Sequence, residues 1–167
     1  MKATQILVLG MVLALGSGTP VRTVSAQASV ERDAASIDVA IAAYLKSSLP
    51  SSGVVLEPRV RAKTGEWSSS RSPARNTALV VALGGSFGRR DSVFACGIMP
   101  SDCTLKGNTL LIFSDPSIDG DHATVYLQRL DRSGFKRIPV VRKDIEIKLE
   151  RQQAGWRVTS STVAAIT

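Results

Sequence analysis

Histidine and cysteine are scarce in this chain, and their scarcity excludes several kinds of site. The 167 residues include one histidine, His122, and two cysteines, Cys96 and Cys103. A zinc site normally needs four ligands, so no metal site is expected. A serine–histidine catalytic pair would have to use His122, and no serine lies in a nucleophile-elbow motif. We therefore predict no metal, no cofactor and no catalytic residue.

The chain also lacks a phosphate-binding motif, and its net positive charge is only moderate. The glycine-rich stretch 84–88 has no Gly-Lys-Ser/Thr ending, which a P-loop requires. The net charge is +7, and residues 1–26 hold two of the cations and no acid, so the remainder keeps +5. This charge is too diffuse to indicate nucleic acid, and no nucleic-acid partner is expected.

Long apolar runs are absent except near the N-terminus. The run Ile6–Leu15 is too short to span a bilayer, which takes about 20 residues. Lys2 precedes it, and the small residues Val24–Ala26 follow it, as in a secretory signal peptide. We predict that residues 1–26 are removed and that a secreted or periplasmic protein without a transmembrane segment begins at Gln27. An uncleaved membrane anchor is the alternative.

The two cysteines are expected to form a disulfide. Exported proteins favour disulfides over free thiols or metal sites. Pairing of Cys96 with Cys103 closes a loop of eight residues. In the chain-entropy description such a loop stabilises the fold by about 2.5 kcal/mol. Two buried free thiols are the alternative.

Two helices are predicted in the first half of the mature chain. Over 30–46, apolar residues recur at i, i+4, i+7 and i+8, which is typical of an amphipathic helix; they are Ile37, Ile41, Tyr44 and Leu45. Ser29 is placed to cap its start. Ser72 and Pro73 resemble the start of a second, short helix over 74–83, and Gly84 would end it.

The rest of the pattern predicts strands. They are expected at 53–60, where Pro58 would confine the strand to an edge, and at 92–98, 109–113, 122–130, 145–149 and 156–166. Residues 131–134 are expected to form a hairpin connection. Ile145, Ile147 and Leu149 alternate with charged residues, so they should face the core and leave the charges in water. The turn at 152–155 then brings Trp156 opposite them.

These elements predict one α+β domain over residues 27–167. An N-terminal amphipathic helix and a short second helix would pack on a curved antiparallel sheet of about four to six strands. Residues 61–75 are expected to form a flexible, serine-rich basic loop. The basic residues in and just before this loop surround Trp67 in sequence, either as a solvated surface or as one that touches anionic lipid, polysaccharide or a partner; they are Arg59, Arg61, Lys63, Arg71 and Arg75.

Three segments carry a resemblance to a known family. They are the N-terminal helix, the stretch 119–125 (DGDHATV) that opens a strand, and the strand Ile145–Leu149 that leads to Gly155–Val158 (GWRV). In this order they resemble the nuclear-transport-factor-2-like superfamily, which includes ketosteroid isomerases and polyketide cyclases. The resemblance implies a cone-shaped fold with a pocket between helix and sheet, where the family's enzymes use an aspartate base and a tyrosine donor.

Candidate pocket or binding residues follow from this resemblance and from the sequence; they are Tyr44, Trp67, His122 and Tyr126. No aspartate matches the family's base, because Asp38 lies on a different face of the helix from Tyr44. His122 beside Asp119 and Asp121 fits an exposed polar turn or an acid–base group.

We therefore expect an exported, non-enzymatic module that binds a small ligand or a partner. The alternatives are an isomerase- or cyclase-type enzyme that uses a helix–sheet pocket, and an envelope-associated structural protein. The expected partner is a small apolar ligand or an anionic envelope surface.

Overall fold

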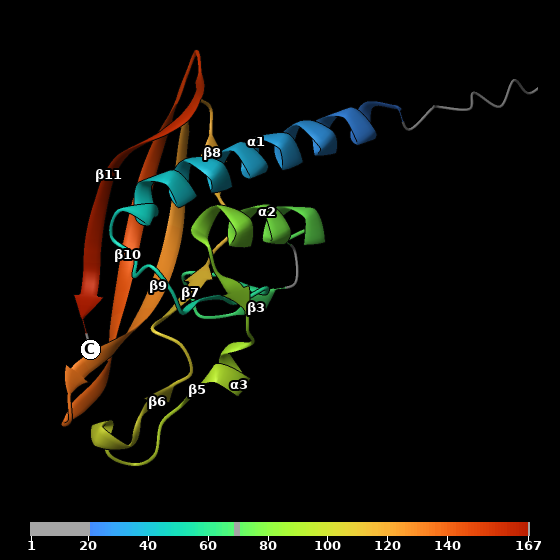
Figure 1. The fold of residues 1–167 in the computed structure, drawn as a ribbon. Coiled ribbons are helices and arrows are strands. Elements are labelled where there is room, and N and C mark those ends of the chain that lie inside the picture. Colours follow the sequence, from blue (N-terminus) through green and yellow to red (C-terminus); the bar gives the residue numbers. More distant parts are fainter. Residues whose placement is uncertain (1–20, 69–70, 167) are drawn as a thin grey trace, which may run out of the picture.

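Two helices cover one face of a sheet in the computed structural model, which describes residues 21–68 and 71–166 (Figure 1). Helix α1 spans Val21–Lys46, and helix α2 spans Pro73–Leu83. Because no proline or glycine interrupts residues 21–29, α1 begins earlier than the predicted Ser29 cap. The charged start and the apolar run of the expected signal peptide lie outside the described residues, and the expected cleavage position after Ala26 lies within α1.

The predicted ends of α2 are confirmed. Ser72 is the N-cap, and its hydroxyl accepts a hydrogen bond from the backbone N–H of Arg75 at 3.4 Å. Pro73 occupies the first turn, where its missing N–H leaves no helical bond unmade. Gly84 ends the helix with φ of 65°, a left-handed conformation that glycine adopts without strain.

Seven strands form the main sheet. Its order is β11-β10-β9-β7-β1-β4, and β8 pairs with β9. The strands are β1 (Val54–Leu56), β4 (Ser86–Phe87), β7 (Thr109–Phe113), β8 (Ser117–Asp119), β9 (His122–Phe135), β10 (Ile138–Gln152) and β11 (Gly155–Ile166).

The sheet is mixed, which corrects the predicted antiparallel arrangement. Strand β1 lies between β7 and β4 and runs parallel to both. It is therefore an interior strand rather than an edge, and it ends at Leu56, so Pro58 does not meet the hydrogen-bond ladder. Parallel neighbours require a long crossover, and the chain supplies one between β1 and β4 through α2.

The main core fills the space between the helices and the sheet. Ile37 and Ile41 of α1 and Leu79 of α2 are buried against strand residues from β7, β9, β10 and β11. The strand residues include Leu111, Phe113, Val125, Leu127, Ile147, Leu149 and Trp156, with Ile145 partly buried beside them. The predicted packing of the C-terminal hairpin is thus confirmed, and Trp156 lies opposite Arg151 across it.

The other face of the sheet carries smaller elements. They are the hairpin β2 (Val60–Arg61) and β3 (Trp67–Ser68), helix α3 (Arg90–Val93), β5 (Phe94–Ala95), the 3₁₀ turn η1 (Pro100–Asp102) and β6 (Thr104–Leu105). Leu110 and Ile112 form a second core cluster with Leu105. Because they alternate along β7 with residues of the main core, this cluster lies on the opposite side of the sheet. The Cys96–Cys103 disulfide is confirmed between β5 and β6.

Three local predictions on this side are wrong. Residues 92–98 form the end of α3 and the short β5 instead of one strand. The stretch 61–75 contains the β2–β3 hairpin and the start of α2 instead of one loop. Residues 131–134 remain within β9, because pairing continues to Phe135 opposite Ile138. No helix among the described residues is long and apolar enough to cross a membrane.

Candidate functional site

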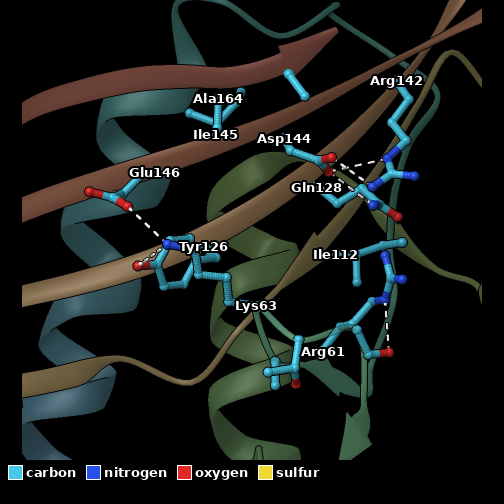
Figure 2. Close-up of a pocket in the computed structure, with 14 residues that line it drawn as sticks. Arg61, Lys63, Ile112, Tyr126, Gln128, Arg142, Asp144, Ile145, Glu146 and Ala164 are labelled. Atoms are coloured by element: carbon cyan, nitrogen blue, oxygen red, sulfur yellow. Dashed lines mark hydrogen bonds and ion pairs between the residues drawn. The ribbon is translucent and has the colours of Figure 1, made fainter. Parts of the chain in front are cut away.

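A pocket with a cavity volume of about 390 Å³ lies between the β2–β3 hairpin and strands β9 to β11. It opens on the face of the sheet that the two long helices do not cover (Figure 2). Polar side chains line it at both ends; they are Arg61, Arg142, Asp144 and Gln128, and Lys63, Tyr126 and Glu146. Ile112, Ile145, Ala164 and Ala165 supply its apolar parts.

Strand alternation explains why these side chains meet. Val125 and Leu127 of β9 enter the main core, so Tyr126 and Gln128 point to the opposite face. The antiparallel register places Glu146 opposite Tyr126 and Asp144 opposite Gln128 on β10. Asp144 and Glu146 are therefore half-buried in the pocket rather than free in water, which corrects the expectation that they would be solvated.

An irregularity in the β10–β11 pairing shapes the pocket's outer wall. Asp144 pairs with Ala165, and Ile145 pairs with Val163, so Ala164 has no partner on β10. Both alanines then line the pocket. Since alanine side chains are small, this β-bulge leaves room beside the polar groups of β10.

Arg142 and Gln128 hold the Asp144 carboxylate in place. Arg142 donates from Nη2 to Oδ2 at 2.6 Å and from Nε to Oδ1 at 3.2 Å, and Gln128 Nε2 donates to Oδ1 at 3.0 Å. Burial acts to raise the pKa of Asp144, but these hydrogen bonds outweigh it and hold the pKa below its ordinary value. Asp144 is thus an ionised acceptor that fixes the Arg142 guanidinium.

Arg61 keeps several donors unused in this pocket. Its Nε donates to the Gly65 carbonyl at 3.2 Å, and its two Nη groups have no hydrogen-bond partner among the described residues. Burial, and then repulsion from Arg142 and Arg90, lower the pKa of Arg61. The Asp144 carboxylate acts in the opposite direction but does not outweigh these effects, so an anion bound to the half-buried guanidinium would stabilise its charge.

Lys63 joins Tyr126 and Glu146 at the other end. Its Nζ donates to the Tyr126 hydroxyl at 3.2 Å, lies 4.6 Å from the ring centre, and is 3.8 Å from Glu146 Oε2 (Figure 2). The bond to Tyr126, and then the nearby Glu146, raise the pKa of Lys63. This end presents a cation and a hydroxyl that can donate to a polar ligand.

The structure brings some of the predicted residues to the pocket and leaves others elsewhere. Tyr126, Arg61 and Lys63 line it. Trp67 lies on the same hairpin, with the Arg59 guanidinium 4.3 Å from its ring centre. Arg59 itself is bonded to the fully buried Glu57.

Tyr44 and His122 lie away from this pocket. Tyr44 is exposed on α1, and its hydroxyl shares a hydrogen bond with Ser161 of β11. His122 is exposed at the start of β9, opposite Glu150 of β10. The pocket thus draws on neither residue.

Arg71 and Arg75 are buried, which corrects their assignment to a basic surface. Their exposed fractions are 3% and 5%. Arg75 Nε donates to Asp38 Oδ2 at 2.8 Å, and the Arg71 guanidinium lies 5.4 Å from the ring centre of Phe113. Arg75 lies in the first turn of α2, and Arg71 directly precedes the N-cap of that helix. The ion pair with Asp38 compensates part of the cost of burying the Arg75 charge.

Sequence reasoning missed four pocket residues. Gln128, Arg142, Asp144 and Glu146 were not recognised as site residues, although Glu146 and Asp144 stood in the predicted strand. The alternation along the strands could have indicated them. Residues next to Val125 and Ile147 in the sequence point to the face of the sheet opposite the main core, so their side chains share that face. Only the position of the distant β2–β3 hairpin shows that this face is enclosed.

Within residues 21–68 and 71–166, no group of three potential metal ligands lies close enough to hold an ion. Comparison with known proteins found no family model, no curated protein and no solved structure that matches this chain.

Proposed function

We propose that this protein is an exported, non-enzymatic module that binds a small molecule carrying an anionic group. The observation that carries the proposal is the Arg61 guanidinium, which is half-buried in the pocket and whose two Nη groups have no hydrogen-bond partner among the described residues. A carboxylate bound there gains charge-assisted hydrogen bonds at a site already partly shielded from water. Arg142, held by Asp144, lies beside Arg61 and repels its charge.

The lining indicates a polar ligand rather than the apolar one expected from the sequence. Lys63 and the Tyr126 hydroxyl extend the row of donors to the far end of the pocket. Ile145 and the two alanines of β11 offer an apolar contact between the two ends. A small acid with a short hydrocarbon or aromatic body therefore fits this arrangement best.

Binding is favoured over the isomerase or cyclase alternative by the state of the carboxylates. Asp144 is held ionised by Arg142 and Gln128, which makes it a weak base. Asp38, whose pKa burial raises, is paired with Arg75 and does not line this pocket. Neither of these two aspartates is therefore placed to abstract a proton from a ligand in the pocket.

Export remains part of the proposal. The confirmed disulfide is of the kind that persists in oxidising compartments, and it supports the signal peptide predicted over residues 1–26. N-terminal sequencing of the exported protein should begin at Gln27. An exported protein that begins at Met1 would contradict the predicted cleavage of a signal peptide.

We also propose a relationship to the nuclear-transport-factor-2-like superfamily. It rests on helix α1 packed against the sheet and on the β10–β11 hairpin with Gly155–Val158. In this chain the space between helix and sheet is occupied by core side chains, and the pocket lies on the opposite face. An experimental structure whose main sheet has a strand order different from β11-β10-β9-β7-β1-β4 would contradict the relationship.

Binding of benzoate, with benzamide as its neutral counterpart, tests the proposed ligand class. We expect chemical-shift changes at Tyr126 and Ala164 with benzoate and none with benzamide. Arg61→Gln should weaken benzoate binding about tenfold or more, since a hydrogen bond to a charged group contributes about 1.5–3 kcal/mol. Arg157→Gln, an exposed change on β11, is the matched control. Equal binding of the two compounds, or no effect of Arg61→Gln, would exclude an anion site.

A further inference from the structure

Two loops meet at one end of the molecule, beyond the pocket. One is the disulfide-closed loop Cys96–Cys103, and the other is the β9–β10 turn Phe135–Ile138. The Arg132 side chain donates to the Leu105 carbonyl and ties β6 to β9, and η1 touches β10. Figure 1 shows the two loops side by side, away from α1 and α2. We call this pair of loops the tip.

Large apolar side chains project from the tip. Ile98 is 99% exposed and Met99 is 60% exposed on the disulfide loop. Phe135 is 78% exposed and Ile138 is 50% exposed on the turn. Single exposed apolar residues are ordinary, but four on two adjoining loops mark an interaction surface.

The same loops carry an excess of positive charge. The segments 94–106 and 132–140 contain four cations and one acid, Asp102, for a net charge of +3. Lys136 and Arg137 stand between the two apolar residues of the turn. Arg132 lies on β9, and Lys106 directly follows β6. Lys106, Lys136 and Arg137 are exposed and form no ion pair among the described residues.

The disulfide loop is held in its exposed shape by its own bonds. The Cys96–Cys103 disulfide closes it, and Asp102 accepts a hydrogen bond from the backbone N–H of Met99 at 3.2 Å. Leu105, directly after the loop, is buried in the second core cluster. Because the loop is anchored on both sides, Ile98 and Met99 lose little freedom when they enter an apolar phase.

We propose that the tip docks on an anionic lipid bilayer. Ile98, Met99, Phe135 and Ile138 would enter the boundary between headgroups and acyl chains, and the cations beside them would meet anionic headgroups. Apolar residues flanked by lysine and arginine are the pattern of interfacial membrane binding. A protein partner would need shape complementarity over a larger area, whereas four apolar side chains ringed by cations suit a fluid charged surface.

Co-sedimentation with vesicles tests the role of the charges. The probes are vesicles of phosphatidylcholine alone and vesicles with about 30% phosphatidylglycerol. The protein is used as isolated from the exporting cell, and all variants share its N-terminus. We expect binding to the anionic vesicles that falls steeply with salt. The double variant K136E/R137E should weaken it about 30-fold or more. The control R32E/R157E changes exposed residues on α1 and at the start of β11, away from the tip, and should change binding little.

A second measurement tests insertion of the apolar residues. The variant I98S/M99S should weaken binding to anionic vesicles at least tenfold, and Val81→Ser, an equally exposed change on α2, should not. In Ile98→Trp, tryptophan fluorescence should be quenched by brominated lipids. Near-UV circular dichroism checks that each variant is folded.

Three outcomes would overturn the proposal. They are equal binding to neutral and anionic vesicles, unchanged binding of K136E/R137E, and an Ile98→Trp fluorescence that brominated lipids leave unchanged. Sedimentation velocity tests the alternative that the tip binds a second copy of the chain. If the protein forms a dimer that I98S/M99S dissolves, the tip binds a second copy of the chain instead of lipid.

Discussion

The guanidinium of Arg75 lies 2.8 Å from the carboxylate of Asp38, and both side chains are buried between α1 and α2. Arg75 also approaches Asp115 at 3.5 Å and Glu31 at 3.8 Å. This ion pair joins two helices that are distant in the sequence, and it stands on the helix side of the sheet, away from the pocket.

Breaking this ion pair on one side should destabilise the fold strongly. Asp38→Ala leaves the Arg75 charge buried with a weakened set of partners, which should lower the free energy of unfolding by about 3–5 kcal/mol. The double variant D38L/R75M should recover a large part of that loss, because no charge remains buried. Urea unfolding of the two single variants and the double variant measures the coupling. Additive effects would show that the two side chains do not act as a pair.

Replacing Arg71 should raise the free energy of unfolding, in contrast to Asp38→Ala. Its Nε and Nη2 have no hydrogen-bond partner among the described residues, and its Nη1 makes one long bond to Asn76 Oδ1 at 3.4 Å. Methionine keeps the apolar contact with Phe113 and removes the unpaired donors, so Arg71→Met should raise the free energy of unfolding by about 1–3 kcal/mol. The measurement is again urea unfolding, with Arg157→Met on β11 as an exposed control. A clear loss of stability would mean that Arg71 has a partner that compensates its burial.

Glu57 should make stability fall in acid. Burial acts to raise its pKa, but hydrogen bonds from the Arg59 side chain and the backbone N–H groups of Arg90 and Arg59 outweigh this and lower the pKa below 4.5. The unfolded chain then takes up the proton first as pH falls, so this contribution is complete above about pH 5 and is lost as the pH falls through the lowered pKa of the folded protein.

Chemical unfolding of the wild type and Glu57→Gln at several pH values checks this. The wild type should lose more stability than the variant between about pH 5 and pH 3. Glu150→Gln, an exposed change on β10, should keep the wild-type slope. Parallel curves for all three proteins would rule out a lowered pKa at Glu57.

Trp156 should contribute a large share of the stability of the C-terminal hairpin. It is 8% exposed, and it packs in the main core with Ile147 and Leu149. Trp156→Ala should therefore lower the free energy of unfolding by about 3–5 kcal/mol. Glu150→Ala on the partner strand should change it by no more than about 0.5 kcal/mol. Denaturant melts of the two variants decide, and similar losses in both would contradict the assigned register.

Removing the disulfide should have a moderate effect. C96S/C103S should lower the free energy of unfolding by about 2.5 kcal/mol, because the closed loop is short. The wild type with and without reductant, and the double variant under both conditions, provide the comparison. Reductant should affect the wild type alone. A wild type that is equally stable in reductant would show that the bond adds nothing to the fold.

Local signals in the sequence predicted several elements well. Ser72, Pro73 and Gly84 mark the ends of α2 because capping depends on a few neighbouring residues. The apolar stretch Thr109–Phe113 forms β7 as expected. The alternation around Ile147 placed one face of β10 in the core, since a strand's side chains point to opposite sides in turn.

The pairing of strands that lie far apart in the sequence could not be predicted from such local signals. Strand β1 is short and apolar, and its place between β7 and β4 depends on partners far along the chain. Likewise, a run of arginines and serines indicates a solvated surface, yet Asp38 on another helix allows Arg75 to be buried. Such compensation by distant residues has no local periodicity.

The sequence by itself determined the ends of α2, the strand alternation, the disulfide partners and the pattern of charge, because each rests on chain neighbours or on the small number of cysteines. Only the tertiary structure decided that the β2–β3 hairpin closes a polar pocket over Tyr126 and Asp144, and that two loops form one apolar, basic tip. Both depend on which distant segments lie together, and that is set by the packing of the whole core rather than by any local stretch.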